Sequence, residues 1–299
     1  RTALLAWLHT RSGGGRFVMR VEDLDAGRVR PGVMEAQLQE LQWLGLDWDE
    51  GPDVGGRHAP YLQTQRMERY QEALRTLASA GRLFRCDCSR RDLARAASAP
   101  HEGEEGPRYP GSCRERIAAP EEMDGREGMA LRFRVEPGVI SFADLIHGKV
   151  ALDPDHGGDF VVRRRDGVAA YQLAVVVDDA AMEITHVVRG ADLLPSTPRQ
   201  LLLYRALGLA EPAWAHVPLA YGADGSRLAK RHGAVSLAEL RAAGVRPERV
   251  VGWMASSLGI GDAGAEASAA SLVERFDLSR ITREASYLTE GTLREILAT

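Results

Sequence analysis

The stretch Tyr171-Gln-Leu-Ala-Val-Val-Val-Asp-Asp179 is a continuous apolar run that ends in two acidic residues. A strand is predicted to follow at residues 184–188, and a helix from about residue 196 to residue 207. Strands that alternate with helices are typical of an α/β protein whose largely parallel sheet is covered on its faces. We therefore predict an α/β fold built around such a sheet.

Further elements are predicted on both sides of this stretch. They are an amphipathic helix at residues 64–80 stopped by Gly81, a strand at 130–135, a hairpin turn at Asp166-Gly167, and helices at 236–243, 247–258 and 271–276. No second sheet is expected after the basic loop that lies between Tyr221 and Ser236. The C-terminal part is therefore predicted to be a small helical unit.

The segment Phe17-Val-Met-Arg-Val-Glu-Asp-Leu-Asp25 is predicted to be an apolar strand that ends in charged residues. Ligands of open α/β sheets bind just beyond the carboxyl ends of strands. Glu22 and Asp23 would then lie where the ammonium group of a substrate could be bound. A strand end whose charges are only solvated is the alternative, and the spacing does not decide between the two.

A basic loop lies between Tyr221 and Ser236, and it contains Gly-Ala-Asp-Gly-Ser-Arg-Leu-Ala-Lys-Arg. Gly222 and Gly225 allow the backbone to bend freely. The loop carries three cations, Arg227, Lys230 and Arg231, as stabilising a transferring phosphoryl group requires. A solvated basic surface loop is the alternative.

All three cysteines, Cys86, Cys88 and Cys113, fall within one short region. Three thiols cannot all pair as disulfides, and a Cys-x-Cys followed by a third cysteine on a Pro-Gly turn resembles a zinc knuckle. Tyr109 and His101 are the candidates for a fourth ligand. Buried free thiols are the alternative.

Composition excludes some classes of protein. The 299 residues, 44% of them apolar, can bury a substantial core in one large or two ordinary domains. No apolar stretch approaches the roughly 20 residues that span a bilayer, and no leader opens the sequence, so we expect cytoplasmic residence without a membrane partner. A net charge of −4 argues against a generally basic nucleic-acid coat, although local cationic patches exist.

Five motifs in fixed order together resemble the class I glutamyl-tRNA synthetases. They are Arg1-Thr-Ala-Leu-Leu-Ala-Trp7, Arg20-Val-Glu-Asp-Leu-Asp25, Tyr171-Gln-Leu-Ala-Val-Val-Val-Asp-Asp179, Val188-Arg-Gly-Ala-Asp-Leu-Leu194 and Arg227-Leu-Ala-Lys-Arg231. The chain is most similar to the short glutamyl-Q tRNA(Asp) synthetases, because the sequence after Arg231 leaves no room for the long helical anticodon-binding region of the full-length enzymes. The cysteine pattern agrees with this subfamily.

The resemblance implies a role for each matching residue. Glu22 would contact the substrate amino acid, Tyr171 would line its pocket, and Arg189 would pair with a substrate carboxylate. A guanidinium binds a carboxylate through two parallel hydrogen bonds, which suits Arg189. A structural ion pair of Arg189 with Asp192 or another acid is the alternative.

The basic loop matches the lysine-serine-lysine loop of the family. Lys230 would stabilise pyrophosphate during catalysis, and Arg227, Lys230 and Arg231 would together bind ATP. Two positions depart from the family: Arg227 replaces a lysine and keeps its charge, whereas Ala229 replaces a serine and removes a hydroxyl.

The zinc set implied by the resemblance is Cys86, Cys88, Tyr109 and Cys113, which favours Tyr109 over His101. Four protein ligands leave no open position, so the Zn²⁺ would be structural. The expected organisation is a Rossmann-like catalytic domain at 1–82 and 128–235, a zinc-bearing insertion at 83–127 and a helical C-terminal part at 236–299.

The implied reaction joins L-glutamate to ATP with Mg²⁺ as glutamyl-adenylate, and then transfers glutamate to queuosine in the anticodon of tRNA(Asp) by a monomer. The family's ATP motif would lie before Arg1, and His9 does not replace it, so a protein that begins at Arg1 is expected not to activate glutamate. Three alternatives remain: the catalytic half of an ordinary synthetase that charges tRNA(Glu), a non-catalytic RNA-binding pseudo-synthetase, and a small-molecule nucleotidyltransferase.

Overall fold

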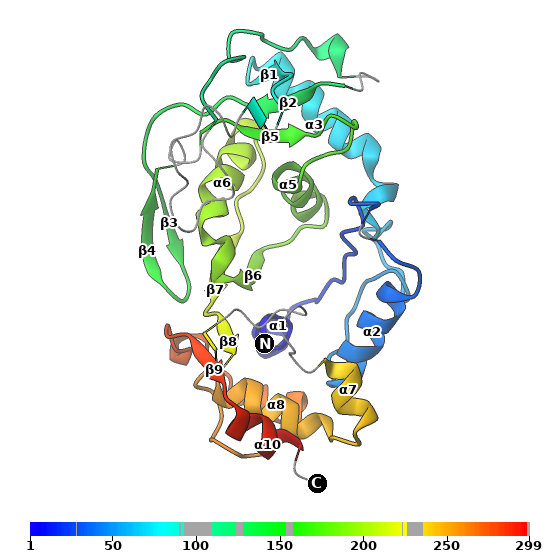
Figure 1. The fold of residues 1–299 in the computed structure, drawn as a ribbon, viewed down its shortest axis with the longest axis vertical. Coiled ribbons are helices and arrows are strands. Elements are labelled where there is room, and N and C mark those ends of the chain that lie inside the picture. The colour runs from blue at the N-terminus through cyan, green and yellow to red at the C-terminus, as the bar shows by residue number, and fades with distance from the viewer. Residues whose placement is uncertain are drawn as a thin grey trace.

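The computed structural model describes residues 1–27, 29–89, 91–92, 109–123, 128–153, 158–222, 224–225 and 236–297. Figure 1 shows three regions, with helix α1 (Thr2–Ser12) near the middle, a small antiparallel sheet above it and the C-terminal helices below it. No helix among the described residues is long and apolar enough to cross a membrane.

The central sheet has four strands in the order β4-β3-β7-β6. Strand β7 pairs in parallel with both β3 and β6, and β3 forms an antiparallel hairpin with β4. The predicted α/β fold with parallel strands is thus confirmed, with one antiparallel edge strand added. The strands are β3 (Ile140–Asp144), β4 (Gly148–Leu152), β6 (His186–Gly190) and β7 (Ala213–Val217).

The opening stretch of apolar sequence forms α5 (Tyr171–Ala181), which is buried on nearly every side from Gln172 to Asp179. Helix α5 contacts α3 (Met67–Ser79), α6 (Thr197–Ala206) and strand β5 (Phe160–Arg163). A helix enclosed in this way is apolar all round rather than amphipathic. The two acids that end the run, Asp178 and Asp179, can be buried because they interact with polar partners inside the protein.

A second sheet is antiparallel and has the order β1-β2-β5. Its strand β1 (Leu83–Cys86) lies in the predicted insertion, while β2 (Ala130–Phe133) and β5 come from the predicted catalytic unit. The turn after β5 is confirmed, since Gly167 has a φ of +82° and Arg164 N–H donates to Val168 O. The stop after α3 is confirmed as well, at Gly81 with a φ of +64°.

The expected strand at residues 17–25 is wrong. This segment makes two isolated parallel bridges, Val18 with Glu50 and Val21 with Leu62. Between these two bridges, residues 51–60 form a separate loop. The segment that pairs with residues 17–25 therefore does not run alongside it continuously. The apolar run is therefore extended and hydrogen-bonded at its two ends without forming a continuous ladder.

The prediction that no sheet follows the basic loop is also wrong. Strand β9 (Ser286–Leu288) pairs in parallel with β8 (Ala220–Gly222), and the rings of Tyr221 and Tyr287 stack at 5.8 Å. The helix expected at 271–276 is the shorter α9 (Ala269–Leu272). Helices α2 (Val33–Trp43), α7 (Leu237–Ala242), α8 (Pro247–Ser256) and α10 (Glu290–Leu297) complete the fold.

The C-terminal helices share a hydrophobic core with the N-terminal helix. Leu4, Trp7 and Leu8 of α1 pack in one buried cluster with Val251 and Met254 of α8. The first and last parts of the chain thus pack against each other, as the position of α1 beside α8 shows (Figure 1), and the same helix α1 also borders a cavity.

Candidate active site

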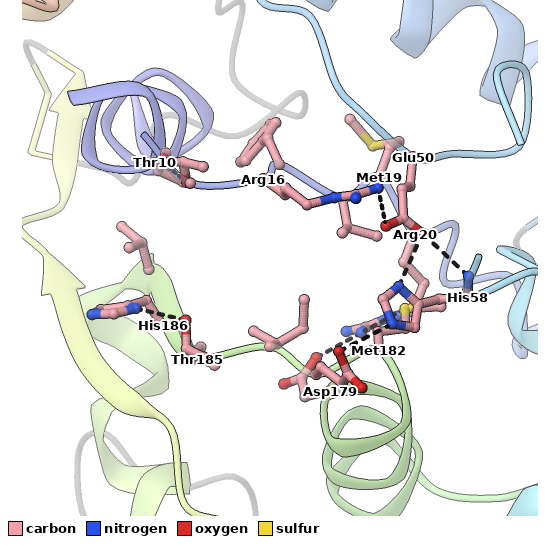
Figure 2. A pocket seen from close by; sticks show the side chains of 18 of the residues that line it. Thr10, Arg16, Met19, Arg20, Glu50, His58, Asp179, Met182, Thr185 and His186 are labelled. Carbon is pink, nitrogen blue, oxygen red and sulfur yellow. Dashed lines mark hydrogen bonds and ion pairs between the residues drawn. The ribbon is translucent and has the colours of Figure 1, made fainter. Parts of the chain in front are cut away.

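A cavity of about 780 Å³ lies between α1 and residues 15–22 on one side and α5 and β6 on the other. Figure 2 shows side chains from both walls pointing toward one another across this space. Residues 50–58 close one end of it. The walls carry acids, arginines and histidines, which suits a charged ligand.

The cavity brings together the three residues that were expected to bind the amino acid, Glu22, Tyr171 and Arg189. Tyr171 is the first residue of α5 and is 39% exposed, while Arg189 is near the end of β6 and is buried. The ATP-binding residues Arg227, Lys230 and Arg231 lie outside the described residues, as does Ala229.

Arg189 is held by uncharged groups. Its Nε donates to His216 Nε2 at 3.1 Å and its Nη1 donates to Gln200 Oε1 at 2.6 Å. Its Nη2 donates to Thr197 Oγ1 at 2.8 Å and to the backbone oxygen of Leu193 at 3.2 Å. The guanidinium also lies 4.8 Å from the centre of the Trp214 ring.

No carboxylate among the described residues forms an ion pair with Arg189. The alternative role for Arg189, a structural ion pair with Asp192, is therefore not seen among these residues. Burial lowers the pKa of Arg189, as it does for a cation whose charge is incompletely compensated. A buried cation in a cavity wall favours an anionic ligand, since a ligand carboxylate would supply the missing charge.

Glu22 belongs to a chain of charges on the opposite wall. Arg20 donates to Asp179 at 2.6 Å and to Glu22 at 3.2 Å. Burial alone would lower the pKa of this guanidinium, but attraction to Asp179, Glu22 and Asp178 raises it. The Glu22 side chain remains 45% exposed, so its carboxylate has room to accept from a ligand ammonium.

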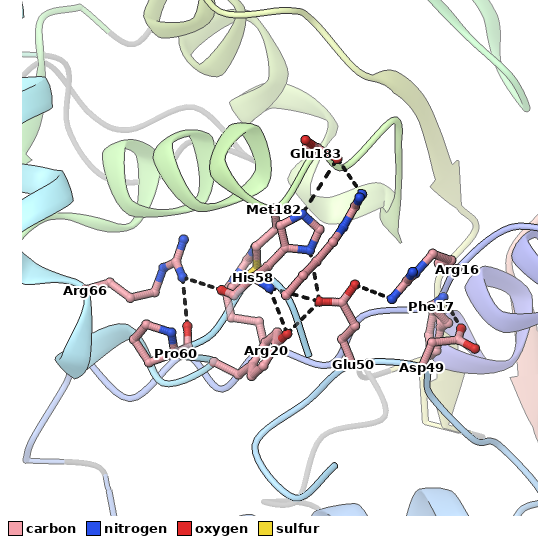
Figure 3. A network of polar contacts seen from close by, with 12 residues as sticks. Arg16, Phe17, Arg20, Asp49, Glu50, His58, Pro60, Arg66, Met182 and Glu183 are labelled. Carbon is pink, nitrogen blue, oxygen red and sulfur yellow. Dashed lines mark hydrogen bonds and ion pairs between the residues drawn. The ribbon is translucent and has the colours of Figure 1, made fainter. Parts of the chain in front are cut away.

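Glu50 is the centre of a polar network at the far end of the cavity (Figure 3). Its carboxylate accepts from Tyr61 at 2.5 Å, from Arg16 at 2.8 Å and from both the backbone and the ring of His58. Burial would raise the pKa of Glu50, but the hydrogen bonds from Tyr61 and His58 lower it to about 2. The network fixes the loop of residues 51–60 as a wall of the cavity.

The three cysteines lie close together at the end of strand β1, and none of them lines this cavity. The Sγ atoms of Cys86, Cys88 and Cys113 all lie within 4.8 Å of one another, and none forms a disulfide. The hydroxyl of Tyr109 is 3.7 Å from Cys86 Sγ and accepts from the backbone N–H of Cys113. Ligands at 2.3 Å around a tetrahedral zinc are about 3.8 Å apart, so the four groups fit one ion. His101 lies outside the described residues.

Several polar residues around the cavity were missed by the sequence analysis, namely Glu50, His58, Asp144 and His216. Each is a single titratable residue in an ordinary stretch of sequence, and no motif marks it. One signal was present for His216, because a histidine inside the apolar strand Ala-Trp-Ala-His-Val needs a buried partner.

Residues 1–294 match the family described as "tRNA synthetases class I (E and Q), catalytic domain". The chain belongs to this family. The cavity lies within the matched region, and its lining includes residues of α1, Arg20 and Glu22, and Tyr171 at the start of α5.

Curated relatives of this synthetase family are close in sequence. The glutamyl-Q tRNA(Asp) synthetase of Symbiobacterium thermophilum is 56% identical over 95% of this chain and 89% of its own length. The protein of the same name from Nocardia farcinica is 47% identical over 98% of this chain and 89% of its own length.

Longer members of the synthetase family match only in part of their length. The glutamate–tRNA ligase of Dehalococcoides mccartyi is 42% identical over 96% of this chain and 58% of its own length. The crystal structure of the glutamate–tRNA synthetase from Elizabethkingia anophelis superposes with a TM-score of 0.81 at 27% identity, over 97% of this chain and 65% of that one.

Proposed function

We propose that this class I ligase activates glutamate with ATP and transfers it to queuosine in the anticodon of tRNA(Asp). Support comes from the relatives named glutamyl-Q tRNA(Asp) synthetase, which are 47–56% identical over 80–89% of their own length. The structural observation that carries the glutamate part is Arg189, a buried cation in the wall of a large cavity that forms no direct ion pair with a carboxylate of the described residues.

Glutamate binding uses both walls of the cavity. Arg189 receives the side-chain carboxylate through charge-assisted hydrogen bonds, with Tyr171 beside it at the start of α5. Glu22 on the opposite wall accepts from the α-ammonium group. The α-carboxylate is left free to react, because neither of these groups engages it.

Activation is a phosphoryl displacement. An oxygen of the α-carboxylate attacks the α-phosphorus of ATP, the bond to the β-phosphate breaks, and pyrophosphate leaves. Mg²⁺ bound with ATP would neutralise the phosphates, and the basic loop with Arg227, Lys230 and Arg231 stabilises the charge on the leaving pyrophosphate. Ala229 provides no hydroxyl for this purpose.

Transfer then forms an ester. A hydroxyl of the queuosine cyclopentene ring attacks the carbonyl carbon of glutamyl-adenylate, its proton is released, and AMP leaves with the electrons of the broken mixed-anhydride bond. The cavity's role is to hold hydroxyl and carbonyl close together in a fixed orientation.

A structural zinc site is proposed for Cys86, Cys88, Tyr109 and Cys113. Four protein ligands leave no position for a reacting water, so the ion would stabilise the fold around β1 and take no chemical step. We also retain the division into a catalytic unit at 1–82 and 128–235, an insertion at 83–127 and a C-terminal part at 236–299. We propose that the protein acts as a monomer in the cytoplasm, where its substrates are found.

The test of glutamate activation is glutamate-dependent exchange of pyrophosphate into ATP by the full-length protein. Arg189→Lys should raise the KM for glutamate about 100-fold, because a lysine cannot replace the several directed N–H groups of the guanidinium. The control is Arg205→Lys, which alters an exposed arginine of α6 that pairs with Glu211 and does not line the cavity. Equal KM values for the two variants would contradict the proposed role of Arg189.

A second acceptor is supported by the relatives named glutamate–tRNA ligase, which are 41–43% identical to this chain. In that case the same adenylate would be transferred to tRNA(Glu). Pyrophosphate exchange does not distinguish the two acceptors, so transfer to each tRNA has to be measured directly.

A further inference from the structure

Three adjacent strands place a carboxylate, an imidazole and a guanidinium in a row behind the cavity wall. Asp144 ends β3, His216 lies in β7, and Arg189 lies in β6 directly opposite His216 in the parallel register. Asp144 Oδ2 is 2.6 Å from His216 Nδ1, and His216 Nε2 is 3.1 Å from Arg189 Nε. Asp144 and His216 are fully enclosed by protein, and only Arg189 reaches the cavity.

The two ends of this row fix the tautomer of the histidine. Arg189 Nε–H can only donate, so His216 Nε2 must accept and carry no proton. The carboxylate of Asp144 can only accept, so the single ring proton of His216 sits on Nδ1. Burial lowers the pKa of His216, and the charge of Arg189 lowers it further, although the hydrogen bond with Asp144 acts in the opposite direction.

Asp144 is itself held as an anion in one orientation. Its Oδ1 accepts from the backbone N–H groups of Ile146 at 2.9 Å and His147 at 2.8 Å. Burial would raise the pKa of Asp144, but hydrogen bonds from His216 and from these backbone groups lower it. The negative charge is therefore present at neutral pH, one imidazole away from Arg189.

This arrangement gives Arg189 a counter-charge without blocking it. An acid bound directly to the guanidinium would take the place of a ligand carboxylate in the cavity. A carboxylate acting through a neutral imidazole orients the guanidinium from behind and leaves its cavity side for the substrate. The other hydrogen-bond partners of Arg189, namely Gln200, Thr197 and the backbone oxygen of Leu193, are uncharged.

We propose that Asp144 and His216 are positioning residues that present Arg189 as a carboxylate receptor, and so set the preference of the site for glutamate over glutamine. The inference rests on the proposed function, in which Arg189 binds the side-chain carboxylate of glutamate. A correctly oriented guanidinium distinguishes a carboxylate from an amide, because the amide offers only one acceptor and brings no charge.

The decisive variant is Asp144→Asn. The backbone N–H groups of Ile146 and His147 keep the amide oxygen at the Oδ1 position, so the amide nitrogen faces His216 Nδ1. The ring must then accept at Nδ1 and carry its proton on Nε2, where it confronts Arg189 Nε–H. Donor faces donor, and the guanidinium is displaced.

The experiment is calorimetric titration of the full-length protein with L-glutamate and with L-glutamine. Asp144→Asn should weaken glutamate binding about 10- to 100-fold while glutamine binding changes by less than about threefold. His216→Leu should do the same, and His216→Gln, whose amide oxygen can replace Nε2 as acceptor, should recover part of the preference. Asp159→Asn alters an equally buried carboxylate in the other sheet region and should leave both affinities unchanged.

The outcomes separate the two levels of the account. If wild-type protein binds glutamate and the Asp144 and His216 variants keep its ratio to glutamine, or lose both amino acids equally, the positioning role is wrong while the proposed function stands. If wild-type protein shows no preference for glutamate, the proposed function fails and the positioning role fails with it.

Discussion

Glu50 and Arg189 are both buried charged residues that line the same cavity, but their interactions within the protein differ. Glu50 accepts hydrogen bonds from Arg16, His58 and Tyr61, so its charge is fully engaged within the protein. The hydrogen-bond partners of Arg189 among the described residues are all uncharged, and the nearby Asp179 forms no direct ion pair with it. A satisfied buried charge stabilises structure, whereas an incompletely compensated one is suited to binding.

Glu50→Gln should lower the free energy of unfolding by about 1–3 kcal/mol at pH 7, because the network loses its anion. The pKa of Glu50 is about 2 in the folded protein against a usual 4.5. A lowered pKa stabilises the fold above the usual value and loses that effect as pH falls toward 2. Urea unfolding of both proteins between pH 7 and pH 3 should therefore show the difference shrinking below about pH 4.5. A difference that stays constant with pH would contradict this account of Glu50.

Single residues also show what sequence could and could not reveal. Glu22, Tyr171 and Arg189 were predicted as site residues because each stands in a motif, and the structure places all three in the lining of one cavity. Asp144 and His216 stand in no motif and become neighbours only when β3 and β7 pair. Contacts between distant strands depend on strand order, which local sequence patterns do not encode.

Among the elements, the helices were predicted better than the strands. Helix α3, helix α8 and the turn at Gly167 follow from periodicity and from residues that stop or bend the chain. Strand β9 has three residues and exists only because β8 lies beside it. The segment 17–25 has the composition of a strand but lacks a continuous partner.

The cysteine element should bind one zinc per chain, measured by elemental analysis of the purified protein. Cys113→Ser should lose most of the metal and lower the melting temperature, because structural zinc contributes directly to folding. Tyr109→Phe should bind zinc more weakly than wild type. The control is Tyr221→Phe, which changes a tyrosine of strand β8 and should bind zinc as tightly as wild type. Full zinc occupancy in Cys113→Ser would disprove the ligand set.

Helix α8 packs too closely against the following loop to accept a side chain at Gly252. A Cβ there would lie 1.9 Å from the backbone oxygen of Ala265. Gly252→Ala should destabilise the protein by about 1–3 kcal/mol in chemical denaturation, although alanine favours helices.

Gly291 provides the matched control in helix α10, since its added Cβ meets nothing closer than 3.7 Å. Gly291→Ala should stabilise the protein by about 0.5–1 kcal/mol through helix propensity alone. If Gly252→Ala is as stabilising as Gly291→Ala, the close packing of α8 against Ala265 and Glu266 is not present in solution.

At the scale of the whole molecule, one cavity lies where the N-terminal helix, the central sheet and α5 meet. Its floor is supported by the C-terminal helices through the core they share with α1 (Figure 1). The antiparallel sheet with the cysteine cluster lies apart from it, at the other end of α3. The candidate active site and the cysteine cluster are therefore in different parts of the molecule.

The central claim is the identity of that acceptor. The full-length protein should be incubated with labelled glutamate, ATP and Mg²⁺, together with tRNA(Asp) that carries queuosine, tRNA(Asp) that lacks it, or tRNA(Glu). We predict label on queuosine-containing tRNA(Asp) and on neither of the other two. Label on tRNA(Glu), or equal labelling of tRNA(Asp) with and without queuosine, would contradict the account.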